Sequence, residues 1–218
     1  MLLVSNLLTF FNMAGCGHEH HEHEHDLSES ERGAQFHLFQ KIDLIKLQCL
    51  NEAEEGSAKN VFKPWDERLD TIKFVESDVD EELLFNIPFV GQVKLKGIVV
   101  IGGENGDHPS EMKLYKNRPF MTFDDANCEP DQTFDMNEDH DGHLEYTPKI
   151  ARFSNVEHLS IYFPRNFGAE TSKVYFIGLK GDFQEAHRHG VTICTYEAKP
   201  NPSDHKTGAF DSVQHPVS

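Results

Sequence analysis

Residues 92–102 read QVKLKGIVVIG, and this stretch decides the fold of the chain. Its first half alternates polar with apolar residues, and its second half is an apolar run between glycines. Alternation is typical of a strand with one face in solvent, whereas a continuous apolar run is typical of a strand buried on both faces. We therefore predict one strand that has a solvated face at its start and is buried on both faces at its end.

Short runs of the same two kinds lie on both sides of this strand. Turn-forming Gly, Asn, Asp and Pro residues separate most of them. Residues 36–50 are interpreted as a short helix or turn that packs Phe36, Leu38 and Ile42 on the core. Many short strands without alternating helices predict an all-β, antiparallel sandwich or barrel. Besides residues 92–102, the predicted strands cover residues 83–89, 111–116, 152–153, 158–163, 173–181 and 191–196.

The composition limits the function. The chain has 218 residues, with 38% hydrophobic and 26% charged, which suits one sizeable globular domain with tails. Its formal net charge of −17 repels nucleic-acid phosphate and anionic lipid, so neither nucleic acid nor a membrane is an expected partner. No apolar run reaches the roughly 20 residues that a membrane-spanning helix needs.

The four cysteines do not form a recognisable framework. Cys16, Cys49, Cys128 and Cys194 are far apart and include no CxxC pair. This spacing argues against a disulfide scaffold, a zinc ribbon and a thioredoxin-type active site. We expect reduced, buried or inert thiols in a cytosolic protein.

Both ends of the chain are expected to be tails. Residues 1–13 are apolar without a preceding cation. This stretch has three alternative interpretations: a signal peptide, the region before a lipoprotein cleavage site at 13–16, or an extension upstream of a true start at Met13. Residues 17–31, GHEHHEHEHDLSESE, predict a disordered His/Glu-rich tail covering 1–34, and 200–218 predict a second tail. The first tail could chelate Zn, Ni or Cu weakly through His18, His20, His21, His23 and His25.

Two motifs suggest metal binding but lack a full ligand set. Residues 137–142, NEDHDG, resemble the start of an EF-hand loop, yet its twelfth position is Pro148 where a bidentate Glu is required. A polar hairpin tip is the favoured interpretation, with loose calcium binding as the alternative. His187 and His189 could share a metal with Glu185, although an exposed turn is the favoured interpretation there. No catalytic motif occurs, so we predict no catalytic residues, no cofactor and no enzyme.

Two short segments are candidates for binding a partner. Asp78, Asp80, Glu81 and Glu82 form an acidic run, which is interpreted as a solvated edge, a carboxylate pair for glycoside chemistry, or a contact for a basic partner. Residues 62–68 carry the single tryptophan, Trp65, which either seals one end of the sandwich or, with Phe62, faces a partner.

Several stretches together resemble the PITH domain family. They include FKPW at 62–65, FVESD at 74–78, EELLFNIPF at 81–89, PSEMKLYKN at 109–117 and NFGAETSKV at 166–174. The resemblance covers roughly residues 36–205 and implies a domain at 35–199. It implies a jelly-roll β-sandwich similar to galactose-binding-type domains, association with the regulatory particle of the 26S proteasome, and a location in cytoplasm and nucleus.

The resemblance implies no catalytic residues. Relatives with two domains carry a thioredoxin half, which this sequence lacks together with its CxxC pair, so dithiol exchange is not implied. We expect a monomeric protein-interaction module. The alternatives are a jelly roll that binds a sugar or small polar ligand, an adaptor in a signalling or transcription-regulating pathway, and a metal- or redox-linked enzyme. The contact candidates are Phe62, Trp65, Asp78, Asp80, Glu81 and Glu82.

Overall fold

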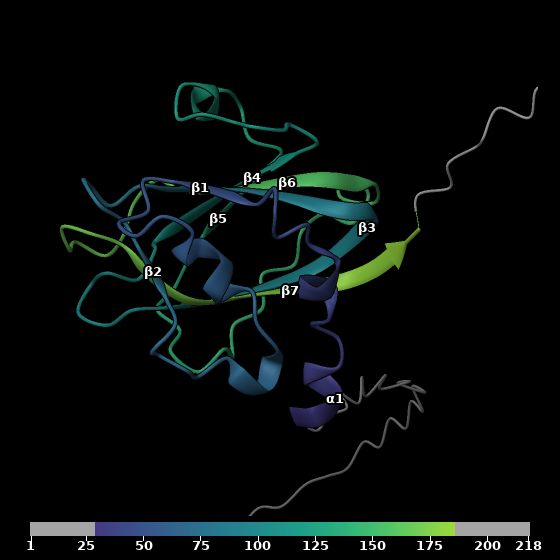
Figure 1. Cartoon of the computed structure of the whole chain (residues 1–218), viewed down its shortest axis with the longest axis horizontal. Helices are drawn as coiled ribbons and strands as arrows, with labels where there is room; N and C mark the ends of the chain where they lie inside the picture. Colours follow the sequence, from purple (N-terminus) through teal and green to yellow (C-terminus); the bar gives the residue numbers. More distant parts are fainter. Residues whose placement is uncertain (1–28, 186–218) are drawn as a thin grey trace, which may run out of the picture. The chain divides into compact units, whose positions relative to one another are not determined.

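The computed structural model of this chain describes residues 29–185 (Figure 1). Several predictions concern residues outside this range. They are the terminal tails up to residue 28 and from 186 with their histidines, the start-site and signal-peptide alternatives, the His187/His189 pair, and the strand at 191–196. The end of the predicted first tail, residues 29–34, lies inside the range and contains a short helix, Glu29–Gly33.

The described residues form mainly antiparallel strands. The elements in chain order are α1 (Glu29–Gly33), η1 (Leu38–Lys41), β1 (Gln48–Leu50), η2 (Ser57–Val61), η3 (Trp65–Glu67), β2 (Val75–Glu76), β3 (Leu83–Gly102), β4 (Glu111–Lys116), η4 (Asp125–Asn127), β5 (Gln132–Asp135), β6 (Val156–Phe163) and β7 (Lys173–Gln184), where η marks a 3₁₀ helix.

The long strand β3 belongs to both layers of the sandwich. Its first part pairs with β1 and with β6, where Leu83 lies opposite Phe163. Its second part pairs with β7, where Val100 lies opposite Ile177. The register shifts at the joint between Pro88 and Val93. One layer therefore contains β1, β3, β6, β4 and β5, the other contains β2, β7 and β3, and β3 passes from one to the other (Figure 1).

The core lies on both faces of β3, as the sequence predicts. Ile98 and Val100 join the main cluster between the layers, whereas Val99 and Ile101 pack with Trp65 on the opposite face. In the first part of the strand, Leu84 belongs to a third cluster on the outer face of its layer. The apolar half of β3 is thus covered from both sides.

The predicted all-β jelly-roll sandwich is confirmed, with local corrections. The runs at 83–89 and 92–102 are one strand, and residues 36–50 contain β1 as well as the short helix η1. Phe36, Leu38 and Ile42 are buried as predicted. Residues 152–153 are not a strand, because they lie in the turn before β6. Strands β2 and β5 are too short to show a period in the sequence. Within residues 29–185, no helix has the length and apolar character to cross a membrane.

Candidate protein-contact surfaces

Trp65 is buried at the end of the sandwich and does not face a partner. Only 5% of its surface is exposed. Its ring stacks on Phe36 with the centroids 4.7 Å apart, and it meets the edge of Phe176 at 5.9 Å. The guanidinium groups of Arg32 and Arg68 lie 5.5 and 4.5 Å from its centroid. The structure therefore supports the sealing interpretation, because cations and rings enclose the indole.

Phe62 is also buried, but in a different cluster. It belongs to the main core and meets the edge of Phe85 with the ring centroids 6.2 Å apart. Neighbouring Lys63 is buried too, and its Nζ donates to the carbonyl of Asp70 at 2.7 Å. The interpretation of Phe62 and Trp65 as exposed contacts is therefore wrong, because packing inside the domain already covers both rings.

The EF-hand-like loop is organised by a buried carboxylate. Asp139 is 6% exposed, and its Oδ1 accepts the backbone N–H groups of Asp141, Gly142 and His143, while its Oδ2 accepts that of Leu144. Backbone donors thus occupy both oxygens of Asp139, so this carboxylate holds the loop together, while the twelfth position lacks the bidentate Glu of a calcium loop. No group of three or more His, Cys, Asp or Glu side chains within 29–185 is arranged to hold a metal.

The two cysteines of the described domain are free thiols. Burial raises the pKa of Cys49 well above its ordinary value, with the nearby Glu52 charge acting in the same direction. A thiol held in its protonated form is a poor nucleophile and metal ligand. Cys49 therefore has the inert character that we expected, while Cys128 lies exposed on the segment after β4.

The acidic run lies on a loop whose shape is set by Asn51. The Asn51 Nδ2 donates to the Asp80 Oδ1 and to the Glu82 carbonyl, both at 2.7 Å. Its Oδ1 accepts the N–H of Val79 at 3.2 Å. Asp78 and Asp80 are exposed, and Val79 between them is 82% exposed. The loop thus presents an apolar side chain between two carboxylates.

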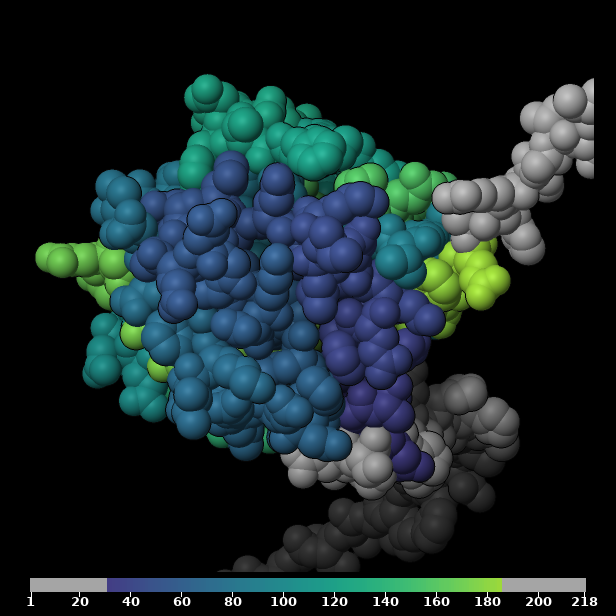
Figure 2. Space-filling model, in the orientation of Figure 1, coloured from purple at the N-terminus to yellow at the C-terminus, as the bar shows by residue number. Residues whose placement is uncertain are grey.

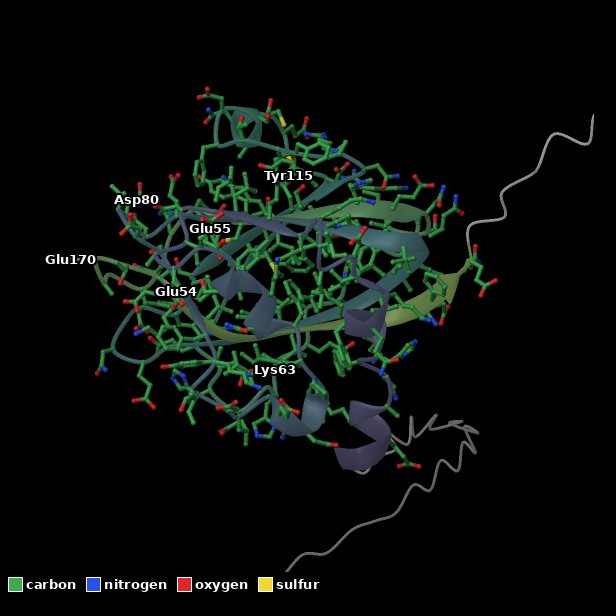
Figure 3. The ribbon with its side chains drawn as sticks, viewed as in Figure 1. Glu54, Glu55, Lys63, Asp80, Tyr115 and Glu170 are labelled. Atoms are coloured by element: carbon green, nitrogen blue, oxygen red, sulfur yellow. The ribbon has the colours of Figure 1, made fainter. Side chains whose placement is uncertain are left out.

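Two other segments lie beside this loop. The N–H of Ala53 donates to the Glu76 carbonyl at 2.9 Å, and the Ser172 Oγ donates to the Glu81 carbonyl. These bonds bring Glu54, Glu55 and Glu170, none of which the sequence singled out, to the same end as Asp80 (Figure 3). We call the group the acidic end; it comprises Glu54, Glu55, Asp78, Asp80, Glu81, Glu82 and Glu170.

A second surface lies on the segment between β4 and β5, which rises at the top of the view in Figure 2. Phe120 on this segment has a positive φ of 57° and is 66% exposed. A bulky side chain at positive φ is rare, because its Cβ crowds the backbone. The sequence signals only a turn at residues 117–119, with no indication that the next residue is an exposed ring.

Buried polar side chains hold the Phe120 backbone. Asn86, which is 6% exposed, donates to the Met121 carbonyl at 2.9 Å and accepts the Met121 N–H at 3.1 Å. Ser160, which is 1% exposed, donates to the Asn86 Oδ1 at 2.9 Å or to the Arg118 carbonyl at 3.2 Å. The loop is therefore fixed from beneath by β3 and β6.

A small hollow opens beside this loop, and we call it the Phe120 hollow. It encloses about 20 Å³, which is room for one water or the end of one side chain. No carboxylate belongs to its lining. The lining residues that matter for its chemistry are Lys46, Pro88, Arg118, Phe120 and His158.

Comparison with known proteins gives one family match and several similar sequences. A family model described as the PITH domain matches residues 28–200. The chain is 64% identical to PITH domain-containing protein 1 of Xenopus laevis, over 87% of this chain and 93% of the relative. It is 59% identical to PITH domain-containing protein 1 of Homo sapiens, over 86% and 89%. A structure of the CBM32-1 and CBM32-2 domains from Clostridium perfringens ZmpB in complex with GalNAc is 10% identical, covers 66% of this chain and 35% of that chain, and has a TM-score of 0.48.

Proposed function

Because this chain belongs to the PITH domain family, we propose that it is a non-enzymatic protein-interaction module that binds the 26S proteasome at its regulatory particle. The single observation that carries the proposal is the family match, which spans the whole described domain. Both relatives are named for this domain and not for a reaction. The proposal includes action as a monomer, in cytoplasm and nucleus.

The acidic end is the contact surface that we propose for this role. Its carboxylates come from three segments that hydrogen bonds hold together, so their arrangement is set before a partner arrives. A surface of this kind fits a basic patch and steers its approach through long-range attraction. Val79 adds an exposed apolar side chain between Asp78 and Asp80, which a partner can cover.

A sugar-binding role is the second candidate. The Phe120 hollow has room for about one water and does not fit a sugar ring. A sugar would have to use one of the larger hollows of the described domain, such as the one of about 360 Å³ that His37, Trp65 and Asp66 help to line. The adaptor alternative differs from the proteasome proposal only in its partner, so the same partner-binding experiment separates the two.

The test is co-migration of the full-length chain with purified 26S proteasome on a gradient or native gel. We expect stoichiometric binding at micromolar concentration that weakens from low to moderate salt, because salt screens exposed charges. The absence of co-migration at low salt overturns the proteasome as partner, and an unbiased search for partners would then be the way to identify an adaptor role.

Two matched variants test the acidic end. The combination Glu55→Gln, Asp78→Asn and Glu170→Gln removes three of its exposed carboxylates. The control combination Asp124→Asn, Glu129→Gln and Asp135→Asn makes the same change in net charge on another segment. We expect the first to weaken co-migration and the second to leave it nearly unchanged. Equal weakening would mean that only total charge matters, and the acidic end would lose its role.

A further inference from the structure

We infer that the Phe120 hollow is a second recognition site, which binds an acidic peptide segment of a protein partner by a carboxylate. The inference rests on the proposed role as an interaction module, but not on the proteasome as its partner. The site differs in chemistry from the acidic end, because its polar side chains are cationic or neutral. One domain would therefore recognise both basic and acidic surfaces.

The first argument is the conformation of Phe120. Its φ of 57° is unfavourable for a bulky residue, and 66% of the side chain remains in water. Asn117 in the same loop also has a positive φ of 54°. Strained residues persist where their surroundings over-determine them, and they concentrate at binding sites. The strained backbone of this loop is therefore maintained at the residue whose aromatic ring is exposed.

The second argument is rigidity. Asn86 and Ser160 are more than nine-tenths buried, and their hydrogen bonds hold the backbone on both sides of Phe120. The Asn117 Oδ1 accepts the N–H groups of Glu157 and His158 at 2.8 and 3.2 Å, which fixes the start of the loop. A ring held in place loses little conformational entropy when a partner covers it.

The third argument is charge. Lys46, Arg118 and His158 line the hollow without a carboxylate among them, although the whole chain carries a net charge of −17. Each of the two cations has one acidic partner outside this lining: the Asp43 Oδ2 lies 3.0 Å from the Lys46 Nζ, and the Asp131 Oδ2 lies 3.9 Å from the Arg118 Nη2. The Arg118 guanidinium also lies 5.2 Å from the centroid of the Tyr115 ring, and it donates to the Cys128 Sγ and to the Glu129 carbonyl, which hold the cation in place.

These features select the occupant. The enclosed space admits the end of one side chain, and the cations favour an Asp or Glu carboxylate there. Phe120 provides an apolar surface beside the hollow for the next residue of the peptide, and the neighbouring Ile45 is 91% exposed. A long polyanion such as RNA is repelled by the net charge, whereas a short acidic peptide carries few charges into that field.

The test uses the full-length chain and fluorescent heptapeptides followed by anisotropy and by amide NMR shifts. The probe is acetyl-Gly-Glu-Asp-Phe-Glu-Asp-Gly-amide, and its neutral match replaces Glu and Asp by Gln and Asn. We expect saturable binding of the acidic probe that weakens with salt, with shifts centred on residues 117–121. Equal binding of the neutral probe, or no binding of the acidic probe at millimolar concentration, overturns the inference.

Variants place the binding site. Phe120→Gly removes the ring and suits the positive φ, so the fold is retained and we expect about tenfold weaker binding. Lys46→Glu should weaken binding about threefold or more, whereas Lys59→Glu, on the exposed surface of η2, makes the same charge change and should not. Unchanged binding by Phe120→Gly and Lys46→Glu overturns the site.

Two further measurements complete the test. One asks whether the hollow binds a partner's peptide or the chain's own acidic segment, and the other asks whether peptide binding and proteasome binding are separate. A peptide of residues 17–31 of this chain tests self-recognition, and tighter binding of that peptide than of the probe would replace the protein partner by the chain's own segment. Proteasome co-migration is scored separately. Loss of co-migration with intact peptide binding removes the proteasome proposal alone, and the reverse result removes the peptide site alone.

Discussion

At the scale of single residues, Trp65 decides how one end of the domain closes. We expect Trp65→Ala to lower the free energy of unfolding by about 3–5 kcal/mol, because it leaves a cavity among Phe36, Phe176 and two guanidinium groups. Trp65→Phe should cost clearly less, since the indole N–H has no hydrogen-bond partner in the described domain. Urea unfolding followed by circular dichroism measures both.

The control for Trp65 is an exposed apolar residue. Val79→Ala changes a side chain that is 82% exposed, so its effect on the free energy of unfolding should stay within about 0.5 kcal/mol. A Trp65→Ala protein that is as stable as Val79→Ala would show that the indole does not seal the domain.

A second residue, His108, makes stability depend on pH. Burial lowers the pKa of His108, and its hydrogen bond to the Pro109 carbonyl only partly opposes this. The unfolded chain gains this proton near pH 6.5, whereas the folded chain resists it to lower pH. Between these values the unfolded state binds more protons, so the free energy of unfolding falls as pH falls below about 6.5.

The measurement is urea unfolding at about pH 7.5 and about pH 5.5. We expect the fall in stability to be smaller in His108→Gln than in the original chain, even if the variant is less stable at both values. Comparing the two falls cancels the contribution of the other titrating groups, and equal falls would mean that His108 stays neutral in both states or titrates normally in both.

At the scale of elements, the contact between β3 and β7 depends on a glycine. A Cβ at Gly181 would overlap the carbonyl oxygen of Lys94 on β3, and backbone cannot move aside as a side chain can. We expect Gly181→Ala to lower the free energy of unfolding by about 1–3 kcal/mol in urea unfolding. Neighbouring Asp182→Ala loses only an exposed ion pair with Lys96, so the free energy of unfolding should fall by less than about 1 kcal/mol. Similar falls for Gly181→Ala and Asp182→Ala would argue against the close approach of Gly181 to the Lys94 carbonyl.

The elements also show how far the sequence could be interpreted. The periods of residues 92–102 and 111–116 predicted β4 and the two-faced burial of β3, because side-chain alternation depends only on local geometry. The passage of β3 from one layer to the other was not predictable from the sequence. Residues 88–92 interrupt the apolar pattern as a turn between two strands would, and the strand continues through them because its first part pairs with β6 and its second part with β7.

At the scale of the whole described domain, the three core clusters all include residues of β3. Since one strand connects them, we expect a single cooperative unfolding transition. The fluorescence of the only tryptophan reports the sealed end, and far-UV circular dichroism reports the sheets. Their urea midpoints should coincide, and an earlier fluorescence transition would show that the sealed end unfolds as a separate unit.

The candidate surfaces are assembled by the fold of the whole domain from distant segments, so the sequence showed only part of them. The run at 78–82 was visible because its acids lie close together in the chain. Glu54 and Glu170 join it only through hydrogen bonds between distant segments. The Phe120 hollow was invisible for the same reason, because its two cations, Lys46 and Arg118, come from separate parts of the chain and its strain exists only in the folded backbone.

The double membership of β3 has a consequence for how the chain is made. A ribosome releases β3, ending at Gly102, long before β6 begins at Val156 and β7 at Lys173. During that interval only β1 has been synthesised among its strand partners. While residues 103–155 are being made, the nascent polypeptide therefore carries most of β3 without a strand partner, and we expect its demand for chaperones to be highest before β6 and β7 emerge.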